Sequence, residues 1–341
     1  MEKVKKILIV NVNWVGDVIF STPFIRAVRE ACPDSHIACL IHPRCAEVLE
    51  GNPRLNEIII YDEEGIHRSL PGKLRLISSL RAAHFDTAFI LHRSVTKAVM
   101  TMLAGVRERV GYAAKRRSAF LTKVVDEPAE ETHKVEYFLN IARASGIAAR
   151  DNSYEFFISD ADRSFIKDLL RQKGVADKDL LVVMCPGGNW GPKRWPKENF
   201  ARLADLLIDK YGVKVALAGA TKDIVLAEEI SEMVKHDIII TCGGTTLKGL
   251  GALLERADLV VANDTGPMHT AVAMKTKVIA LFGPTSPGIT GPYGKGNYRV
   301  ISRHEGCDIP CYDLSCTDNR CMAAILVEDV LREAESMLAG S

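Results

Sequence analysis

The stretch KILIVNVNWVGDVIFSTPFIRAVREA, residues 6–31, joins an apolar run to an amphipathic segment through a short polar turn. An apolar run such as KILIVNV, residues 6–12, is typical of a strand buried on both faces of a parallel sheet. The segment that continues from VIFSTPFIRAVREA has the spacing of a helix that covers such a sheet. This strand, turn and helix therefore predict an α/β fold that begins at the N-terminus.

Apolar runs alternate with amphipathic segments along the rest of the chain, in two series. We predict strands near 6–12, 36–42, 57–62 and 87–91, and a second set near 180, 214, 237, 258 and 277. Between the series lies the polar, irregular segment SGIAARDNSYEFFISDADRS. We therefore expect one domain over 1–155, a second over 156–322, and a C-terminal helix over 323–341, for which a return onto the first domain is one expected placement.

The bulk composition is that of an ordinary globular protein, with 341 residues, 47% of them hydrophobic and 26% charged. No apolar run is long enough to cross a membrane and no signal peptide is evident, so we expect a cytoplasmic protein. The net charge of +1 argues against a nucleic-acid partner. Lys and Arg outnumber Asp and Glu by 22 to 17 over 1–150, and are outnumbered 22 to 26 over 151–341. The excess of basic residues in the first half would suit an anionic partner there. An ordinary solvated surface is the alternative interpretation.

The turn NWVGDV places a carboxylate where the first strand passes into a helix. Gly16 permits a tight or positive-φ turn, and Asp17 would sit at the positive end of the helix dipole. Asp17 has two interpretations, a helix cap or a functional carboxylate. A cap does not account for Trp14, whose large ring suits the wall of a ligand site.

The loop CPGGNWGPKRWPKENF, residues 185–200, follows the first strand of the second series. Gly187 and Gly188 expose backbone amides, and Lys193 and Arg194 follow before the next helix. Amides and two cations beyond a strand indicate an anion site, and a solvent-exposed loop with ordinary basic residues is the alternative.

Two further turns of the second series carry polar groups after a strand. In VVANDTGPMHTAVAM, residues 260–274, Asp264 ends the strand, and the helix begins near Thr265 and Gly266, so free amides would face a phosphate. His269 lies one helical turn further on, where a structural histidine is the more common finding. The turn AGATKD and the loop LFGPTSPGITGPYG could line a nucleotide pocket; the first of these contributes Thr221, Lys222 and Asp223.

Several familiar signatures are missing from the sequence, among them GxGxxG after a strand, GxxxxGK[ST], GxSxG and HExxH. The pattern DxD occurs at 160–162 and at 177–179, in polar loops ahead of helices. Both are interpreted as solvated helix caps and not as metal ligands, so no cofactor or metal is expected.

Nine cysteines are present, and four of them fall within fifteen residues: Cys307, Cys311, Cys316 and Cys321. Their spacing differs from the paired CxxC pattern of zinc knuckles. Structural thiols, a zinc site and a redox-dependent disulfide all remain open as interpretations.

Taken together, NWVGDV, PGGNWGPKRWP, GATKD and ANDTGPMHTAVAMKTKVIALFGPTSP resemble glycosyltransferase family 9, the ADP-heptose:lipopolysaccharide heptosyltransferases. The motifs occur in order from residue 7 to about residue 287. The resemblance implies the GT-B architecture, with two Rossmann-like parallel-sheet domains facing across a cleft. It also implies an inverting, metal-independent transfer of heptose to the lipopolysaccharide inner core at the inner membrane surface.

The resemblance further implies roles for single residues. Asp17 would be the general base toward the acceptor hydroxyl, and Lys193 would face the departing diphosphate. The rest of the donor site would comprise Gly187, Gly188, Arg194, Thr221, Lys222, Asp223, Asp264, Thr265, Gly266 and His269. The acceptor would contact Trp14, Arg93, Lys97 and Arg116. The three basic residues among these belong to a basic run that also includes Arg107, Arg109, Lys115 and Arg117.

Three alternatives remain at this stage. Another GT-B transferase with a different sugar nucleotide or acceptor is the nearest, because the fold would be the same. A nucleotide-binding module without turnover is disfavoured by the presence of Asp17 and Lys193. A nicotinamide oxidoreductase is disfavoured by the missing glycine fingerprint.

Overall fold

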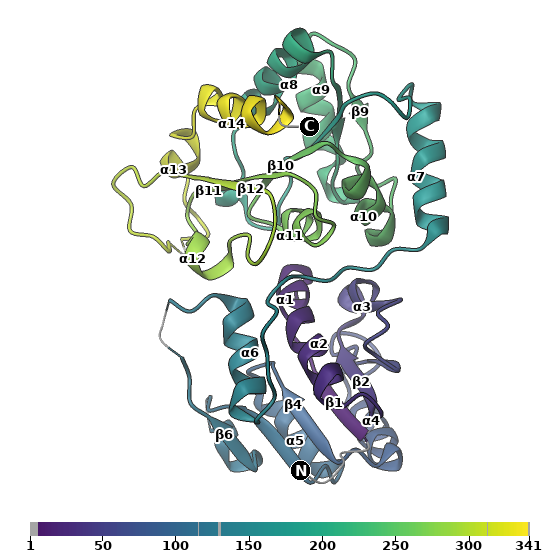
Figure 1. The fold of residues 1–341 in the computed structure, drawn as a ribbon. Coiled ribbons are helices and arrows are strands. Elements are labelled where there is room, and N and C mark those ends of the chain that lie inside the picture. The colour runs from purple at the N-terminus through teal and green to yellow at the C-terminus, as the bar shows by residue number, and fades with distance from the viewer. Residues whose placement is uncertain (1–5, 115, 129–130, 312, 340–341) are drawn as a thin grey trace. The chain divides into compact units, whose positions relative to one another are not determined.

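The computed structural model describes residues 6–339 except 115, 129–130 and 312. The chain divides into two compact units, one ending at Phe157 and the other beginning at Ile158 (Figure 1). The predicted boundary after residue 155 lies close to this division. Among the described residues, no helix combines the length and the apolar composition that crossing a bilayer requires.

The first unit holds a six-stranded sheet in which every neighbouring pair is parallel, in the order β3-β2-β1-β4-β5-β6. The strands are β1 (Lys6–Val10), β2 (His36–Ile41), β3 (Glu57–Ile60), β4 (Thr87–Ile90), β5 (Glu108–Tyr112) and β6 (Lys123–Val125). The helices are α1 (Val15–Phe20), α2 (Thr22–Ala31), α3 (Pro43–Leu49), α4 (Leu70–Ala83), α5 (Val95–Leu103) and α6 (Lys134–Ala144), with a 3₁₀ turn η1 (Arg117–Phe120). Helices α4 and α5 pack on the face that presents Leu8 and Val10, and α2 packs beside α6.

The second unit repeats this topology. Its strands are β7 (Leu181–Cys185), β8 (Lys214–Leu217), β9 (Ile239–Ile240), β10 (Leu259–Asn263), β11 (Val278–Phe282) and β12 (Tyr298–Ser302). They form a parallel sheet in the order β12-β11-β10-β7-β8-β9. When the strands of each sheet are numbered from that sheet's own first strand, both sheets have the order 3-2-1-4-5-6. Both are therefore Rossmann-like sheets, each with a switch in chain direction beside its first strand.

Helices cover both faces of the second sheet. They are α7 (Asp160–Gln172), α8 (Lys197–Tyr211), α9 (Ile224–Met233), α10 (Leu247–Arg256), α11 (Gly266–Ala273), α12 (Pro287–Thr290), α13 (Arg320–Ala323) and α14 (Val327–Ala339), with 3₁₀ turns η2 (Gly191–Lys193) and η3 (Thr221–Asp223). Asp162 closes a capping box with Ser159 at the start of α7, so this DxD segment is a helix cap, as predicted.

The C-terminal helix belongs to the second unit. Helix α14 packs on α8, β10, β11 and β12, and Val330 and Ala334 join the core formed by Val182 and Phe200. The expected placement of this helix on the first domain is therefore wrong. Its apolar stripe completes the second core, because α8 and α9 alone leave part of that face uncovered.

All nine predicted strands are present, and three strands escaped prediction: β5, β6 and β12. The first two residues of β5 (ERVGY) are both charged, and β6 has only three residues. β12 is an edge strand with two exposed positions. β6 and β12 are edge strands, and edge strands need few apolar residues, so their sequences resemble loops.

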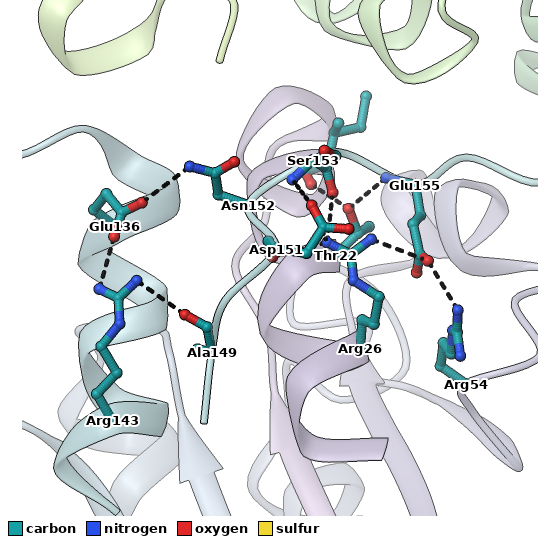
Figure 2. Close-up of polar contacts among 11 residues, drawn as sticks. Thr22, Arg26, Arg54, Glu136, Arg143, Ala149, Asp151, Asn152, Ser153 and Glu155 are labelled. Atoms are coloured by element: carbon teal, nitrogen blue, oxygen red, sulfur yellow. Dashed lines mark hydrogen bonds and ion pairs between the residues drawn. The ribbon is translucent and has the colours of Figure 1, made fainter. Parts of the chain in front are cut away.

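The last residues of the first unit are tied to α2 (Figure 2). Arg26 donates to the carbonyl oxygens of Asp151 and Ser153, at 2.8 and 3.0 Å, and pairs with the carboxylate of Glu155 at 3.1 Å. The backbone N–H of Glu155 donates to Thr22 Oγ1. These contacts hold residues 151–155, the end of the first unit, against helix α2.

Candidate active site

Both sheets place polar groups at the carboxyl ends of the two strands that flank the switch point. In the first unit these strands are β1 and β4, and in the second they are β7 and β10. Ligands of open parallel sheets bind there, because the chain leaves neighbouring strands in opposite directions and opens a crevice.

In the first unit, α1 begins directly after β1. Trp14 is its N-cap residue, and Asp17 lies in the first helical turn, where the helix dipole favours a negative charge. Asp17 is therefore not the capping residue itself. Gly16 also lies inside this helical turn and does not have a positive φ, so of the tight or positive-φ turn that it would permit, the positive-φ form is not adopted.

Trp14 is 54% exposed, although tryptophan is usually well buried. The guanidinium carbon of Arg44 lies 4.2 Å from the centre of its ring, and Arg44 Nε donates to the carbonyl oxygen of Asn13 at 2.8 Å. Arg44 thus holds both the ring and the turn. The ring remains available to a ligand beside Asp17.

Lys97 lies beneath this turn and not on the surface. It is 2% exposed, and its ammonium group donates to Asn13 Oδ1 at 2.7 Å and toward the carbonyl oxygen of Asn11 at 3.4 Å. Burial lowers the pKa of Lys97 to about 8, while nearby Glu63 favours the charged form. The prediction that Lys97 contacts the acceptor is corrected: its side chain is used to hold Asn13.

The predicted basic run separates into exposed and structural residues. Arg93 is exposed and pairs with Glu127 at 2.9 Å, and Arg116 is exposed in a left-handed conformation. By contrast, Arg117 is buried and donates to the carbonyl oxygens of His92 and Tyr112. The other predicted basic residues are Arg107, which is exposed, Arg109, which donates to the carbonyl oxygens of Val106 and Phe120, and Lys115, which lies outside the described residues.

In the second unit, Lys193 and Asp264 form an ion pair at the switch point. Lys193 Nζ lies 2.6 Å from Asp264 Oδ2, so the loop after β7 is joined to the end of β10. The Asp264 side chain is 4% exposed and that of Lys193 is 21% exposed. The ammonium group therefore keeps access to a ligand while its carboxylate partner is buried.

Asp264 is held by several donors. Thr285 Oγ1 donates to Oδ2 at 2.7 Å, and His269 Nε2 lies 3.8 Å from Oδ1. Burial on its own would raise the pKa of Asp264, but the His269 contact and the charge of Lys193 lower it to about 2. Asp264 is therefore ionised at neutral pH, and it orients Lys193 and His269.

This pKa predicts a pH dependence of stability. The folded pKa of about 2 lies below the ordinary 3.8, so Asp264 stabilises the fold above pH 4, and that stabilisation is lost as the pH falls toward 2. The shift corresponds to about 2 kcal/mol in all, of which about 1 kcal/mol is lost by pH 3. Urea unfolding of the second unit, followed by tryptophan fluorescence, should therefore show the advantage of wild type over Asp264→Asn shrinking between pH 5 and pH 3. A difference that stays constant with pH would contradict this assignment.

The loop that carries Lys193 is fixed by the neighbouring strand. Asn263 is fully buried; its side chain donates to the carbonyl oxygen of Pro186 at 2.8 Å and accepts from the backbone N–H of Trp195 at 3.1 Å. The Arg194 guanidinium donates to the carbonyl oxygen of Gly188 at 2.6 Å. Arg194 therefore helps to shape the loop, and its contact with the donor stays a prediction.

Gly187 is required by close packing against Asp223. A Cβ atom at Gly187 would lie 2.4 Å from the carboxyl carbon of Asp223. Asp223 is buried; one of its oxygens accepts from the backbone N–H of Ala220 at 2.9 Å, and the other has no hydrogen-bond partner among the described residues. Lys222 bonds to the side chain of Asn189, and Thr221 opens the 3₁₀ turn η3. The turn after β8 thus lies beside the loop after β7.

Helix α11 begins at the end of β10, with Thr265 as its N-cap residue and Gly266 as its first residue. The first amides of a helix lack intrahelical partners and carry partial positive charge, so they suit a phosphate. Gly188 lies next to Thr265, since a Cβ at Gly188 would come within 3.2 Å of its methyl group. Lys193, the α11 terminus and the glycine loop are therefore neighbours in the second unit.

The cysteine segment packs behind these loops. The backbone N–H of Cys311 donates to the carbonyl oxygen of Pro284, and Asn319 Nδ2 donates to that of Arg194 at 3.1 Å. All four cysteines are free thiols, with Cys321 buried and Cys307, Cys311 and Cys316 partly exposed. Among the described residues, no three His, Cys, Asp or Glu side chains are grouped so as to hold a metal ion.

Four positioning residues were not assigned a role from the sequence: Asn13, Arg44, Glu63 and Thr285. Thr285 lies in the loop LFGPTSPGITGPYG, which was noted for its composition without a residue being chosen. Asn13 lies within the quoted turn. Arg44 and Glu63 give no local signal, because only the folded sheet brings α3 and the β3–α4 loop to the turn after β1.

Two Rossmann-like sheets in tandem, with polar groups at both switch points, define the GT-B class of glycosyltransferases. The chain belongs to glycosyltransferase family 9 (heptosyltransferase), which residues 73–319 match. It is 30% identical over 301 residues to lipopolysaccharide heptosyltransferase 2 of Escherichia coli K12, covering 84% of this chain and 85% of that protein.

Solved structures agree with this assignment. The glycosyl transferase family 9 protein from Veillonella parvula DSM 2008 aligns with a TM-score of 0.91 at 26% identity, covering 99% of this chain and 98% of that one. The E. coli ADP-heptose lps heptosyltransferase II aligns with a TM-score of 0.81 at 26% identity, covering 98% and 99%. The predicted family and fold class are therefore confirmed.

Proposed function

We propose that this enzyme transfers heptose from ADP-heptose to the inner core of lipopolysaccharide, with inversion at the anomeric carbon and without a metal ion. The observation that carries the proposal is the Lys193–Asp264 pair beside the N-terminus of α11. A buried carboxylate fixes the ammonium group, and the helix amides add partial positive charge. This arrangement suits a diphosphate that gains charge as the bond to the sugar breaks.

On the donor side, Lys193 and the first amides of α11 would hold the diphosphate of ADP. Asp264 and His269 would act as positioning residues, since Asp264 is buried and engaged by Lys193 and Thr285. The turn with Thr221, Lys222 and Asp223 would face the nucleoside, because it lies beside the glycine loop. Gly187 and Gly188 would allow the backbone to approach the ligand.

On the acceptor side, Asp17 would take the proton of the attacking hydroxyl group as the new glycosidic bond forms. Its place in the first turn of α1 favours the ionised carboxylate. Trp14 would offer its exposed ring to the sugar, and Arg93 and Arg116 would face acidic groups of the core. In this scheme Lys97 supports the turn and does not touch the acceptor.

The test supplies ADP-heptose together with core acceptors that carry zero, one or two heptoses, and measures product mass. We expect the mass of a single heptose to be added to one of these acceptors. UDP-glucose serves as the parallel donor. Transfer from UDP-glucose, with none from ADP-heptose, would replace the proposal with another sugar-nucleotide transferase of the same fold.

The acceptor is lipid-linked in this proposal, so the reaction would take place at the cytoplasmic face of the inner membrane. Association with that surface would be peripheral, since no described helix is suited to span a bilayer.

A further inference from the structure

The first unit exposes three large aliphatic side chains within nine residues. Ile66 is 71% exposed, Leu70 is 70% exposed and Leu74 is 53% exposed. Leu70 and Leu74 are four residues apart on α4 and so lie on one face of that helix. Scattered exposed leucines are ordinary, but two that share a helix face, with an exposed isoleucine in the loop packed against the first turn of that helix, form an apolar patch that calls for a partner.

The loop that carries Ile66 is held in place by hydrogen bonds. Both carboxylate oxygens of Asp62 accept backbone N–H groups, from Gly65 at 2.8 Å and from Ile66 at 3.2 Å. The carbonyl oxygen of Ile66 lies against Gly72, where a Cβ atom would come within 2.1 Å. The backbone of Ile66 is therefore packed against the first turn of α4, while its side chain is left exposed.

The charged residues of α4 and of the segment just before it are all basic: residues 65–84, GIHRSLPGKLRLISSLRAAH, include four Lys or Arg residues and no Asp or Glu. The preceding loop residues Asp62, Glu63 and Glu64 are acidic, and their carboxylates face backbone N–H groups, Asn13 and His42 respectively. Arg68 and Arg75 are exposed and Lys73 is partly exposed, and in the described part of the chain none of the three is paired with a carboxylate. Aliphatic side chains flanked by unpaired cations match an anionic lipid surface, in which headgroups meet the cations and acyl chains meet the leucines.

The patch is also connected to the turn that carries Asp17. Glu63, three residues before Ile66, accepts a hydrogen bond from the side chain of Asn13. The β3–α4 loop follows β3 and the β1–α1 turn follows β1. These strands lie on either side of β2 in one parallel sheet, so both connections leave the same edge of that sheet. A membrane that contacts this loop would lie next to the proposed acceptor turn.

We infer that Ile66, Leu70 and Leu74, together with Arg68, Lys73 and Arg75, form a docking face for an anionic bilayer surface. This inference rests on the proposed function, because a lipid-linked acceptor places the enzyme at a membrane. The docking face holds the acceptor turn beside the headgroups, where the core sugar emerges. Helix α4 does not insert across the bilayer; it lies along its surface.

The test is flotation of the full chain with vesicles of phosphatidylcholine containing about one third phosphatidylglycerol, compared with phosphatidylcholine alone. Wild type should float with the anionic vesicles and much less with the neutral ones. Leu70→Ser/Leu74→Ser should lower the partition coefficient at least ten-fold. Lys73→Glu/Arg75→Glu should lower it by about five-fold for each cation lost. The matched controls are Leu326→Ser and Lys235→Glu, which alter exposed side chains of the second unit; Leu326 is 56% exposed. Both controls should leave the partition coefficient unchanged.

A second measurement separates docking from catalysis. Heptosyl transfer to a water-soluble core oligosaccharide, without its lipid, should be the same for wild type and for Leu70→Ser/Leu74→Ser. Equal flotation of wild type and both docking variants would overturn the docking face. So would a shift of these variants from dimer to monomer without any vesicle binding, which would assign the patch to a second copy of the chain. Vesicle binding that is lost in the variants, with no heptosyl transfer by wild type, would support the docking face and overturn the proposed function.

Discussion

Replacing Asp17 with Asn should lower the rate of heptosyl transfer by about 10²- to 10⁴-fold while leaving ADP affinity within about two-fold of wild type. The amide has nearly the same shape as the carboxylate but cannot accept the proton of the acceptor hydroxyl. ADP affinity should persist, because the proposed diphosphate site is built from the loops after β7 and β10. Loss of a negative charge from the first turn of α1 should cost only about 0.3–1 kcal/mol of stability.

The matched control is Glu30→Gln, which neutralises an exposed carboxylate near the end of α2. It should leave the rate unchanged. Transfer would be measured under single-turnover conditions, so that product release does not mask the chemical step. A rate for Asp17→Asn close to that of wild type would remove Asp17 from the role of general base.

Replacing Lys193 with Met should weaken ADP binding by about 10- to 100-fold, which corresponds to the 1.5–3 kcal/mol typical of a hydrogen bond to a charged group. The loss of transfer rate should be larger than the loss of affinity, because the leaving diphosphate carries more charge in the transition state than in the bound donor. Methionine keeps the length and apolar character of the lysine stem and removes only the ammonium group, which lies 5.6 Å from the centre of the Trp190 ring. Isothermal titration with ADP and single-turnover transfer measure the two effects separately.

Lys197→Met is the control for this variant. Lys197 lies four residues further along the chain and pairs with Glu229 at 3.0 Å on the surface, where an ion pair contributes little. The ADP affinity of Lys197→Met should match that of wild type. An unchanged ADP affinity in Lys193→Met would show that the Lys193–Asp264 pair serves the fold and not the donor.

The sequence predicted the strands that are buried on both faces and the turns that follow them. Runs such as LLVVMCP and DLVVAND have one interpretation in an α/β protein, because no loop tolerates so many apolar residues. The polar turns after these strands then follow from the rule that ligands bind at the carboxyl ends of parallel strands. Asp17, Lys193 and Asp264 were all placed in turns after strands by this reasoning, and their roles were implied by the family resemblance.

The sequence did not predict which individual side chains are buried and which are exposed. Lys97 and Arg93 occupy the same short segment and have the same charge, yet one is buried beneath a turn and the other is exposed. Lysine is rarely buried, so residue type favoured the surface. The partner that makes burial possible, Asn13, lies more than eighty residues away in the sequence.

The same limit applies to the C-terminal segment. Its helical spacing was evident, but an amphipathic stripe does not identify the sheet that it covers. Trp195 supplies part of the answer, since its indole N–H donates to the carbonyl oxygen of Ile325 at 2.9 Å. Pairing of this kind between distant segments emerges only from the packed core.

That indole contact has a consequence for the order in which the protein is made. The buried core residues of the first unit end at Phe156, so they are complete while the second unit is still being translated. The second core includes Met322, Ile325 and Val330 together with Trp195. The loop that carries the donor lysine therefore acquires its final support only after nearly the whole polypeptide has left the ribosome, and the two halves of the enzyme mature at different times.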